Sequence, residues 1–313
     1  MRKITLKRTV LIMLLSCFMA PAYGEKAVTP SDVFTTVQKL DLLTERIRHH
    51  MGAPKALPLK LAIENAQPHD VFFQAQTLFQ KTNRLLFQVT RTRLPVPEIP
   101  QQVYLPADVL ELVQRSENNL SLILMELGLP SSASITADDR ADASPSDVFL
   151  AIQGLNRQVN RLLDTPFAPS DVYMQVTLAI GYGAKQLARF PKARRIPDPS
   201  EAASGRVPSD VYFRLLEGLE RLTKIYELHG LASLRVDAET LQKEEITPSD
   251  VYDIASLLVA RLDFLHKHNK IQMLPRKPFY PGKVYPTDVY RQAGILLSQL
   301  DSLIEMHNRN SAN

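Results

Sequence analysis

Eight aspartates recur along the chain, each at the centre of the same short motif, and their carboxylates are the first candidates for chemistry. The motif reads proline, any residue, aspartate, valine and then usually an aromatic residue. Carboxylates that gather at one end of a molecule could bind a cation such as Ca²⁺. The eight aspartates are Asp32, Asp70, Asp108, Asp147, Asp171, Asp210, Asp250 and Asp288.

The proline two residues before each aspartate favours a structural role for the carboxylate. Proline fits the first turn of a helix because its φ is fixed and it has no N–H that needs a partner. The aspartate then falls at the third helical position, where it can accept free backbone N–H groups and complement the helix dipole. We therefore predict eight structural helix caps, with no metal and no other cofactor bound. On this basis Asp250→Ala should cost about 1 kcal/mol.

Apolar residues after each motif follow the spacing of packed α-helices. Steps of four and three residues, as in Val211, Leu215, Leu219 and Leu222, place one apolar stripe along a helix. Proline-rich arms separate the predicted helices, and an extended arm, at about 3.3 Å per residue, can run back along a whole helix. Successive helices can then start from the same end of the molecule.

The interval between the fourth and fifth motifs divides the chain in two. Asp147 and Asp171 lie much closer in the sequence than any other consecutive pair of motif aspartates, such as Asp171 and Asp210. This short interval predicts a tight link around residues 164–167 that joins antiparallel neighbouring helices. We expect an all-α fold of eight helix-plus-extended-arm repeats in two four-helix bundle-like lobes, residues 25–165 (repeats one to four) and 166–313 (repeats five to eight). A continuous solenoid of eight units is the alternative.

Residues 1–24 resemble a bacterial export signal. They have a basic start, a short apolar segment over residues 10–20 and a small-residue cleavage site that ends at Gly24. We predict that residues 1–24 are a removed signal peptide, which places the mature protein in the periplasm or outside the cell. A minor alternative is a lipoprotein signal, in which Cys17 becomes a lipid anchor. No later apolar segment is long enough for transmembrane insertion of the mature chain.

The charge of the predicted mature chain is balanced. The chain has 37 Lys and Arg against 33 Asp and Glu, and removal of Arg2, Lys3, Lys7 and Arg8 with the leader leaves 33 against 33. A nucleic-acid-binding protein needs a basic surface to neutralise phosphates. The balance therefore argues against a nucleic-acid partner.

Four tyrosines follow the valines of the last four motifs: Tyr173, Tyr212, Tyr252 and Tyr290. At equivalent positions on four helices they could form an aromatic rim that grips a peptide or a glycan, and we take them as possible partner-binding residues. The alternative is partly buried packing like that expected of Phe34, Phe72 and Phe149. Nearby, Gly181 and Gly183 weaken the fifth predicted helix, which indicates a close helix contact or a kink.

The histidines are candidates for a zinc or copper site, because His266 and His268 lie two residues apart. However, no pair has the four-residue spacing of one helix face, and the predicted mature chain has no cysteine. Six of the seven histidines fall in the last turns of predicted helices, where a protonated imidazole suits the helix dipole. The sequence therefore predicts C-terminal helix residues here and no metal site.

We expect a protein that is not an enzyme. The chain has no Gly-x-Ser-x-Gly, His-Glu-x-x-His, phosphate-binding loop or dinucleotide motif. The predicted function is an exported, non-catalytic helical repeat protein, acting as a protein-binding, scaffold or sensory accessory module for an envelope protein or peptide partner in the bacterial cell envelope. The alternative is a periplasmic small-ligand or metal-binding protein that uses a helical-bundle cavity. Polar residues at one level of the apolar seam would mark such a cavity, and Thr44 and Thr82 are candidates.

Overall fold

The computed structural model describes residues 27–96, 103–131, 142–191, 193–198, 204–237, 241–243 and 246–311. The predicted leader and Cys17 lie outside these residues. The described helices are α1 (Pro30–Met51), α2 (Pro68–Thr90), α3 (Pro106–Glu126), α4 (Pro145–Asn160), α5 (Pro169–Leu187), α6 (Pro208–Leu228), α7 (Pro248–His268) and α8 (Pro286–Ser311). Two short strands, β1 (Ala62–Glu64) and β2 (Arg235–Asp237), complete the elements. The all-α prediction is confirmed. None of the helices described is long and apolar enough to cross a membrane.

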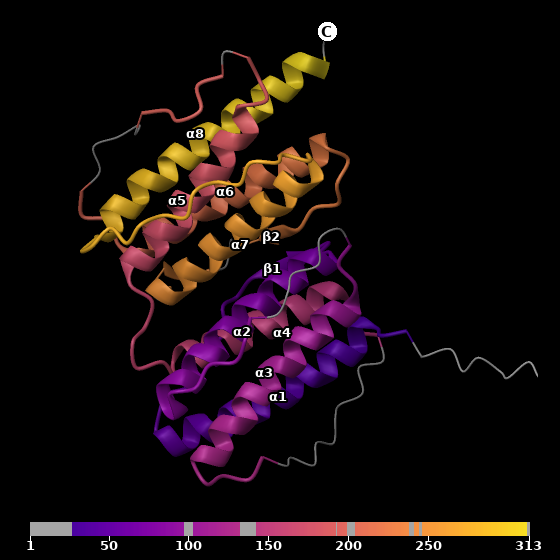
Figure 1. Ribbon diagram of the computed structural model, residues 1–313, viewed down its shortest axis with the longest axis vertical. Helices are drawn as coiled ribbons and strands as arrows, with labels where there is room; N and C mark the ends of the chain where they lie inside the picture. Colours follow the sequence, from indigo (N-terminus) through magenta and orange to yellow (C-terminus); the bar gives the residue numbers. More distant parts are fainter. Residues whose placement is uncertain are drawn as a thin grey trace, which may run out of the picture.

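The helices form two four-helix bundles, as the sequence predicts (Figure 1). In the first bundle each helix packs against two neighbours, in the ring order α1-α3-α2-α4. The second bundle has the corresponding order, α5-α7-α6-α8. α1 and α2 therefore lie diagonally across the first ring, as do α3 and α4, whereas α2 and α3 are neighbours; the arm between α1 and α2 must pass around a third helix.

All four helices of each bundle start at the same end. The motif prolines and valines of the four helices meet there and line one small apolar hollow per bundle. The buried valines are Val33, Val71, Val109 and Val148 in the first bundle and Val172, Val211, Val251 and Val289 in the second. Parallel helices need long returning connections, which explains why the arms are long.

The arms return along the outside of the bundles, and a glutamine in each bundle holds one of them. Gln158 of α4 donates to the carbonyl of Ala56 at 3.1 Å and accepts its backbone N–H at 3.0 Å. Gln299 of α8 donates to the carbonyl of Arg195 at 2.6 Å. Both glutamines hold the eleventh position after the aspartate of their motif, and Ala56 and Arg195 likewise hold equivalent positions in their own repeats. The same device therefore fixes corresponding arms in the two bundles.

The two glycines of α5 allow close contacts from its neighbours. A Cβ on Gly181 would lie 2.8 Å from the Cβ of Pro275, in the arm between α7 and α8. A Cβ on Gly183 would lie 2.6 Å from Oε1 of Gln299. The prediction of a close helix contact is therefore confirmed for Gly183, whereas the close neighbour of Gly181 is an arm.

The prediction that the helices before and after the short link are packed neighbours is wrong. α4 packs against α1 and α2, whereas α5 packs against α7 and α8. The link instead crosses from one bundle to the other, and α2 holds it. Arg84 donates to the carbonyl of Thr165 at 2.8 Å, and Gln88 accepts the N–H of Asp164 at 2.9 Å. A short link is sufficient because it joins the end of one bundle to the start of the next.

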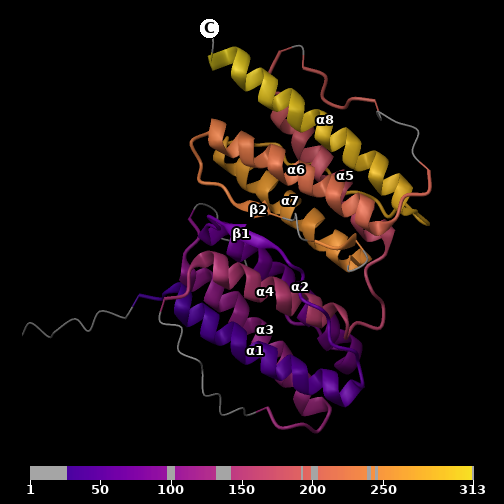
Figure 2. The ribbon, with the colours of Figure 1, turned by 180° about the vertical axis from the view of Figure 1, so that it is seen from behind.

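The bundles pack side by side with their helices in opposite directions, and α2 and α7 lie at the centre of the contact (Figures 1 and 2). The strands add a second connection, since β1 from the arm before α2 pairs antiparallel with β2 from the arm before α7. In this pair Ile63 lies opposite Val236. The contact therefore combines one helix pair with one strand pair.

Candidate functional site

Each of the eight motif carboxylates accepts the backbone N–H of the residue that precedes its helix. The oxygen–nitrogen distances are 2.7 to 3.1 Å. Each carboxylate therefore lies at the start of its own helix, in the geometry of a helix cap. Among the described residues, no three His, Cys, Asp or Glu side chains are arranged to hold one metal ion.

Two of the eight carboxylates differ from the rest because they are buried between the bundles. Asp70 of α2 is 0 % exposed and Asp250 of α7 is 3 % exposed, whereas the other six are half-buried. Each of the two caps its own helix and also faces a cation. The candidate site is built around these two positions, and we call it the interbundle cluster: Asp70, Lys81, Arg157, Asp250, Asp253 and Arg261.

Asp250 pairs with Arg157, which reaches across from α4. The Nε of Arg157 lies 2.9 Å from Oδ1 of Asp250, and one Nη donates to Oδ2 at 3.5 Å. The other Nη donates to the carbonyl of Leu57 in the first long arm. The forked guanidinium thus joins the start of α7, the end of α4 and an arm.

Lys81 of α2 pairs with Asp253, one turn further along α7. Its Nζ lies 2.5 Å from Oδ1 of Asp253, and Asn160 donates to the other carboxylate oxygen at 3.4 Å. Burial lowers the pKa of the Lys81 ammonium and raises the pKa of the Asp253 carboxyl, and the attraction between the two groups opposes both shifts. The pair is stable as an ion pair only while the bundles remain together and each charge has its partner.

At the other end of the contact, Asp70 faces Arg261 of α7. The Nε of Arg261 lies 3.8 Å from Oδ1 of Asp70, and one Nη donates to the hydroxyl of Ser233 at 2.9 Å. The guanidinium also lies over the ring of Tyr226 at 4.3 Å. Beside it, the ring of His69 stacks on Phe264 at a centroid distance of 4.3 Å. Burial lowers the pKa of His69, so its neutral ring is favoured in this aromatic packing.

The cluster has an internal symmetry that follows the repeat. Lys81 lies eleven residues after Asp70, and Arg261 lies eleven residues after Asp250. Because α2 and α7 run in opposite directions, the cation of each helix lies near the start of the other. The cluster contains three cations and three carboxylates, so the charges balance inside the contact. Such groups are costly to leave unpaired, which makes this cluster a strong determinant of how the bundles dock.

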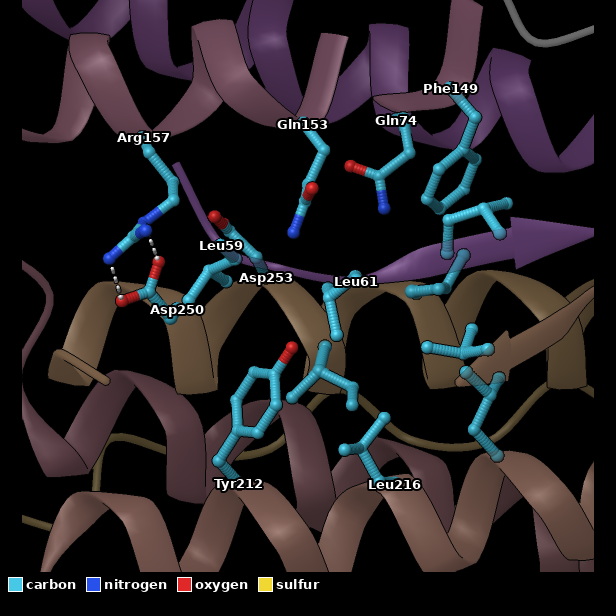
Figure 3. A pocket seen from close by; sticks show the side chains of 15 residues that line it. Leu59, Leu61, Gln74, Phe149, Gln153, Arg157, Tyr212, Leu216, Asp250 and Asp253 are labelled. Carbon is cyan, nitrogen blue, oxygen red and sulfur yellow. Dashed lines mark hydrogen bonds and ion pairs between the residues drawn. The ribbon is translucent and has the colours of Figure 1, made fainter. Parts of the chain in front are cut away.

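A small cavity lies between the bundles beside Asp250 and Arg157 (Figure 3). Gln74 and Gln153 extend into it from the first bundle and Tyr212 from the second. Its volume is about 40 Å³. A buried water needs about 10 to 15 Å³ on this measure, so the cavity has room for about three water molecules and is too small for an organic substrate.

The four tyrosines proposed as a partner-binding rim have different environments. Tyr212 is 4 % exposed and lines the cavity, and burial raises the pKa of its hydroxyl. Tyr252 stacks on Phe167 at 3.9 Å, and the hydroxyl of Tyr173 accepts a hydrogen bond from Gln292 at 2.8 Å. Tyr290 packs below the guanidinium groups of Arg206 and Arg214, at 4.4 and 4.0 Å. These contacts are those of packing, and Tyr212 is not accessible to a partner.

Three histidines gather where α6, α7 and α8 end. The ring of His229 lies 4.4 Å from that of His307 and 6.0 Å from that of His268. Nδ1 of His229 lies 2.8 Å from the carbonyl of Ile225, in the last turn of its own helix. Burial lowers the pKa of His268 and His307, and the neighbouring His229 and Arg189 lower it further. His268 and His307 therefore resist protonation.

The two threonines considered as markers of a ligand cavity lie inside the first bundle. Thr44 donates to the carbonyl of Leu40 in its own helix at 2.8 Å. Thr82 accepts a hydrogen bond from Asn119 of α3 at 3.0 Å and donates to the carbonyl of Phe79. Neither threonine lines the cavity between the bundles. Their polar groups are satisfied by local contacts.

An open groove of about 530 Å³ lies on the outer side of the first bundle, between α1 and α4. Its walls are mainly apolar and include Leu42, Leu57 and Leu150, and Gly154 adds space because no atom lies within 4 Å of a Cβ placed there. Asp41 lies at one side, where burial raises the pKa of its carboxyl and the nearby Lys55 opposes the shift.

The repeat motif does not contain the cations of the interbundle cluster. Lys81 and Arg261 share the eleventh position after the aspartate, which also holds the two glutamines that fix the arms. A comparison of that column across the repeats would have revealed an unusual set of long polar side chains next to the apolar stripe. Arg157 lies one residue before Gln158 of that column, and no repeat pattern marks it.

Compared with known protein families, curated proteins and solved structures, the chain matches none of them.

Proposed function

We propose that the protein is an exported, non-catalytic binding or scaffold module of the bacterial cell envelope, and that its arms contact the partner. The interbundle cluster joins the two bundles into one body. Its small cavity and mutually paired charges favour a structural role for this interior site. The binding surface is then expected on the outside.

The observation that carries this proposal is the exposure of large apolar side chains on the arms. The arm between α7 and α8, residues 270–285, exposes five of them: Met273, Leu274, Phe279, Tyr280 and Tyr285. Phe279 is 94 % exposed. Isolated apolar residues are common on protein surfaces, but a run of five on one short segment is typical of an interaction surface.

Site-specific photo-crosslinking in cells that export the protein tests this proposal. A photoreactive residue at position 279 should give a discrete adduct with an envelope component. The matched control is position 125, because Met125 is also a strongly exposed apolar residue but lies on a helix of the first bundle. Equal adduct patterns at the two positions, or no adduct at position 279, would contradict a binding role for the arm.

The groove between α1 and α4 favours a second candidate function, the binding of a small amphipathic ligand. Its volume of about 530 Å³ lies in the range of small-molecule sites. The fluorescent probe anilinonaphthalene sulfonate should bind there, and Gly154→Leu should fill the groove and displace it. Unchanged probe fluorescence in this variant would exclude the groove as the ligand site.

A further inference from the structure

We propose that the arm between α7 and α8 binds anionic phospholipid surfaces, with its cations on the phosphate headgroups and its aromatic side chains at the headgroup boundary. This proposal rests on the function proposed above, because it names the envelope component that the arm contacts. We call residues 270–285 the basic-aromatic arm.

The charge of this arm is entirely positive. It contains Lys270, Arg276, Lys277 and Lys283 and no aspartate or glutamate. All four cations are exposed. Among the described residues, no ion pair involves Arg276 or Lys277, so their charges remain available to a partner. Because the charge of the predicted mature chain is balanced, this concentration of cations is a local feature of the arm.

The apolar side chains of the arm alternate with these cations. Phe279 and Tyr280 follow Arg276 and Lys277 almost directly, and all four are exposed. Aromatic rings with adjacent lysine and arginine side chains suit the boundary between lipid headgroups and acyl chains. The phosphates of anionic lipids provide the opposite charge for the cations.

Contacts at Pro275 and Val284 hold the arm to the second bundle, and its charged and aromatic side chains are exposed. Pro275 packs directly on Gly181 of α5, and Val284 packs against the core. α5 makes its helix contacts with α7 and α8, so the arm lies on a side of the second bundle that does not face the first. The arm therefore packs on the bundle while its charged and aromatic side chains remain accessible from outside.

A lipid surface explains these features better than a folded protein partner. Residues 270–285 form no strand that could pair with a sheet edge and no helix that could pack in a groove of a partner protein. Its exposed side chains are instead a mixture of cations and aromatic rings without a repeating spacing. A fluid anionic surface accepts such a mixture because headgroups and acyl chains rearrange around each side chain.

Sedimentation with vesicles tests the proposal. The protein, purified after export to the periplasm of a bacterial host, should bind vesicles of phosphatidylglycerol and phosphatidylethanolamine but bind phosphatidylcholine vesicles weakly. Arg276→Gln/Lys277→Gln should bind about 25-fold more weakly, as expected for two surface cations at about fivefold each. Phe279→Ser/Tyr280→Ser should reduce binding roughly tenfold, because the apolar contribution is lost. Added salt should weaken binding of the unaltered protein.

The matched control removes two cations from an arm of the first bundle. Lys55→Gln/Lys60→Gln has the same change in net charge, and it should alter vesicle binding less than twofold. Circular dichroism of every variant should show unchanged helix content, since the altered side chains are exposed. Equal losses in the two charge variants would overturn the proposal, because net charge and not the arm would then determine binding.

Absence of binding to phosphatidylglycerol vesicles at low salt would also overturn it. If position 279 nevertheless crosslinks to one envelope protein in cells, the function proposed above stands and only the lipid assignment fails. If position 279 gives no adduct and vesicles are not bound, both proposals fail. A lipid adduct at position 279 together with vesicle binding that depends on Arg276 and Lys277 supports both.

Discussion

The starts of α6 and α7 have the same five residues, Pro-Ser-Asp-Val-Tyr, but the structure gives them different neighbours. Asp210 of α6 is half-buried and caps its helix through the N–H of Val207. Asp250 of α7 makes the same cap and is buried against Arg157 of the other bundle. The local sequence specifies the cap in both, whereas the packing of the bundles adds Arg157 as an ionic partner of Asp250.

The largest effect is expected from removal of the Asp250 carboxylate, which both caps α7 and pairs with Arg157. Asp250→Ala should lower the free energy of unfolding by about 3 to 5 kcal/mol, because the buried guanidinium of Arg157 loses the carboxylate that faces it. Asp210→Ala should cost only about 1 kcal/mol, since it removes a cap alone. Urea unfolding of the two variants measures the difference. Equal costs would show that the ion pair adds nothing to the cap.

This expectation corrects the cost of about 1 kcal/mol that the sequence predicts for Asp250→Ala. The sequence contains the cap, but it does not show that Arg157 lies beside it. The tertiary contact therefore raises the expected cost severalfold without any change in the local structure.

A double-mutant cycle at the second ion pair sharpens the comparison. Lys81→Met alone should cost about 3 kcal/mol, because the buried Asp253 carboxylate loses the cation that neutralises it. Lys81→Met with Asp253→Leu should restore most of that stability, since two apolar side chains can replace a buried ion pair at little cost. Urea unfolding of both single variants and the double variant gives the coupling energy. A double variant less stable than both single variants would contradict this interpretation.

Two helix glycines test whether the close packing of an arm on its helix contributes to stability. Gly181→Ala should destabilise the protein by about 1 to 2 kcal/mol, because the new Cβ would lie 2.8 Å from Pro275. Gly154→Ala should stabilise it by up to about 1 kcal/mol, since no atom lies within 4 Å of the new Cβ and alanine favours a helix. Thermal unfolding compares the two variants. Stabilisation by both changes would show that Pro275 can move away from the new Cβ at little cost.

The smallest effect is a pH dependence from the histidines at the end of the second bundle. Burial lowers the pKa of His268 and His307 in the folded protein, with His229 and Arg189 adding to the shift. The unfolded chain therefore binds protons first, and the free energy of unfolding should fall as the pH decreases from about 7 to about 5. His268→Gln/His307→Gln should reduce this slope in urea titrations at several pH values. An unchanged slope would assign it to other groups.

The repeat allowed the architecture to be predicted well, but the candidate site only in part. The eight motif aspartates lie at eight helix starts because proline and aspartate act locally, within the first turn. Thr44 and Thr82 were considered as markers of a cavity, yet they form contacts inside the first bundle. The cavity that exists lies between the bundles, where Gln74 and Tyr212 come from distant segments.

By itself, the sequence determined the eight helices, their common direction within each bundle and the division at the short link. These features follow from interactions between residues close in the chain: the cap, the apolar spacing and the length of each arm. Only the tertiary structure decided which motif carboxylates became buried and which cations reached them. Lys81 and Asp253, for example, pair across the contact although α3, α4, α5 and α6 lie between them in the chain. Their contact depends on two bundles docking in opposite directions, and no local interaction specifies that arrangement.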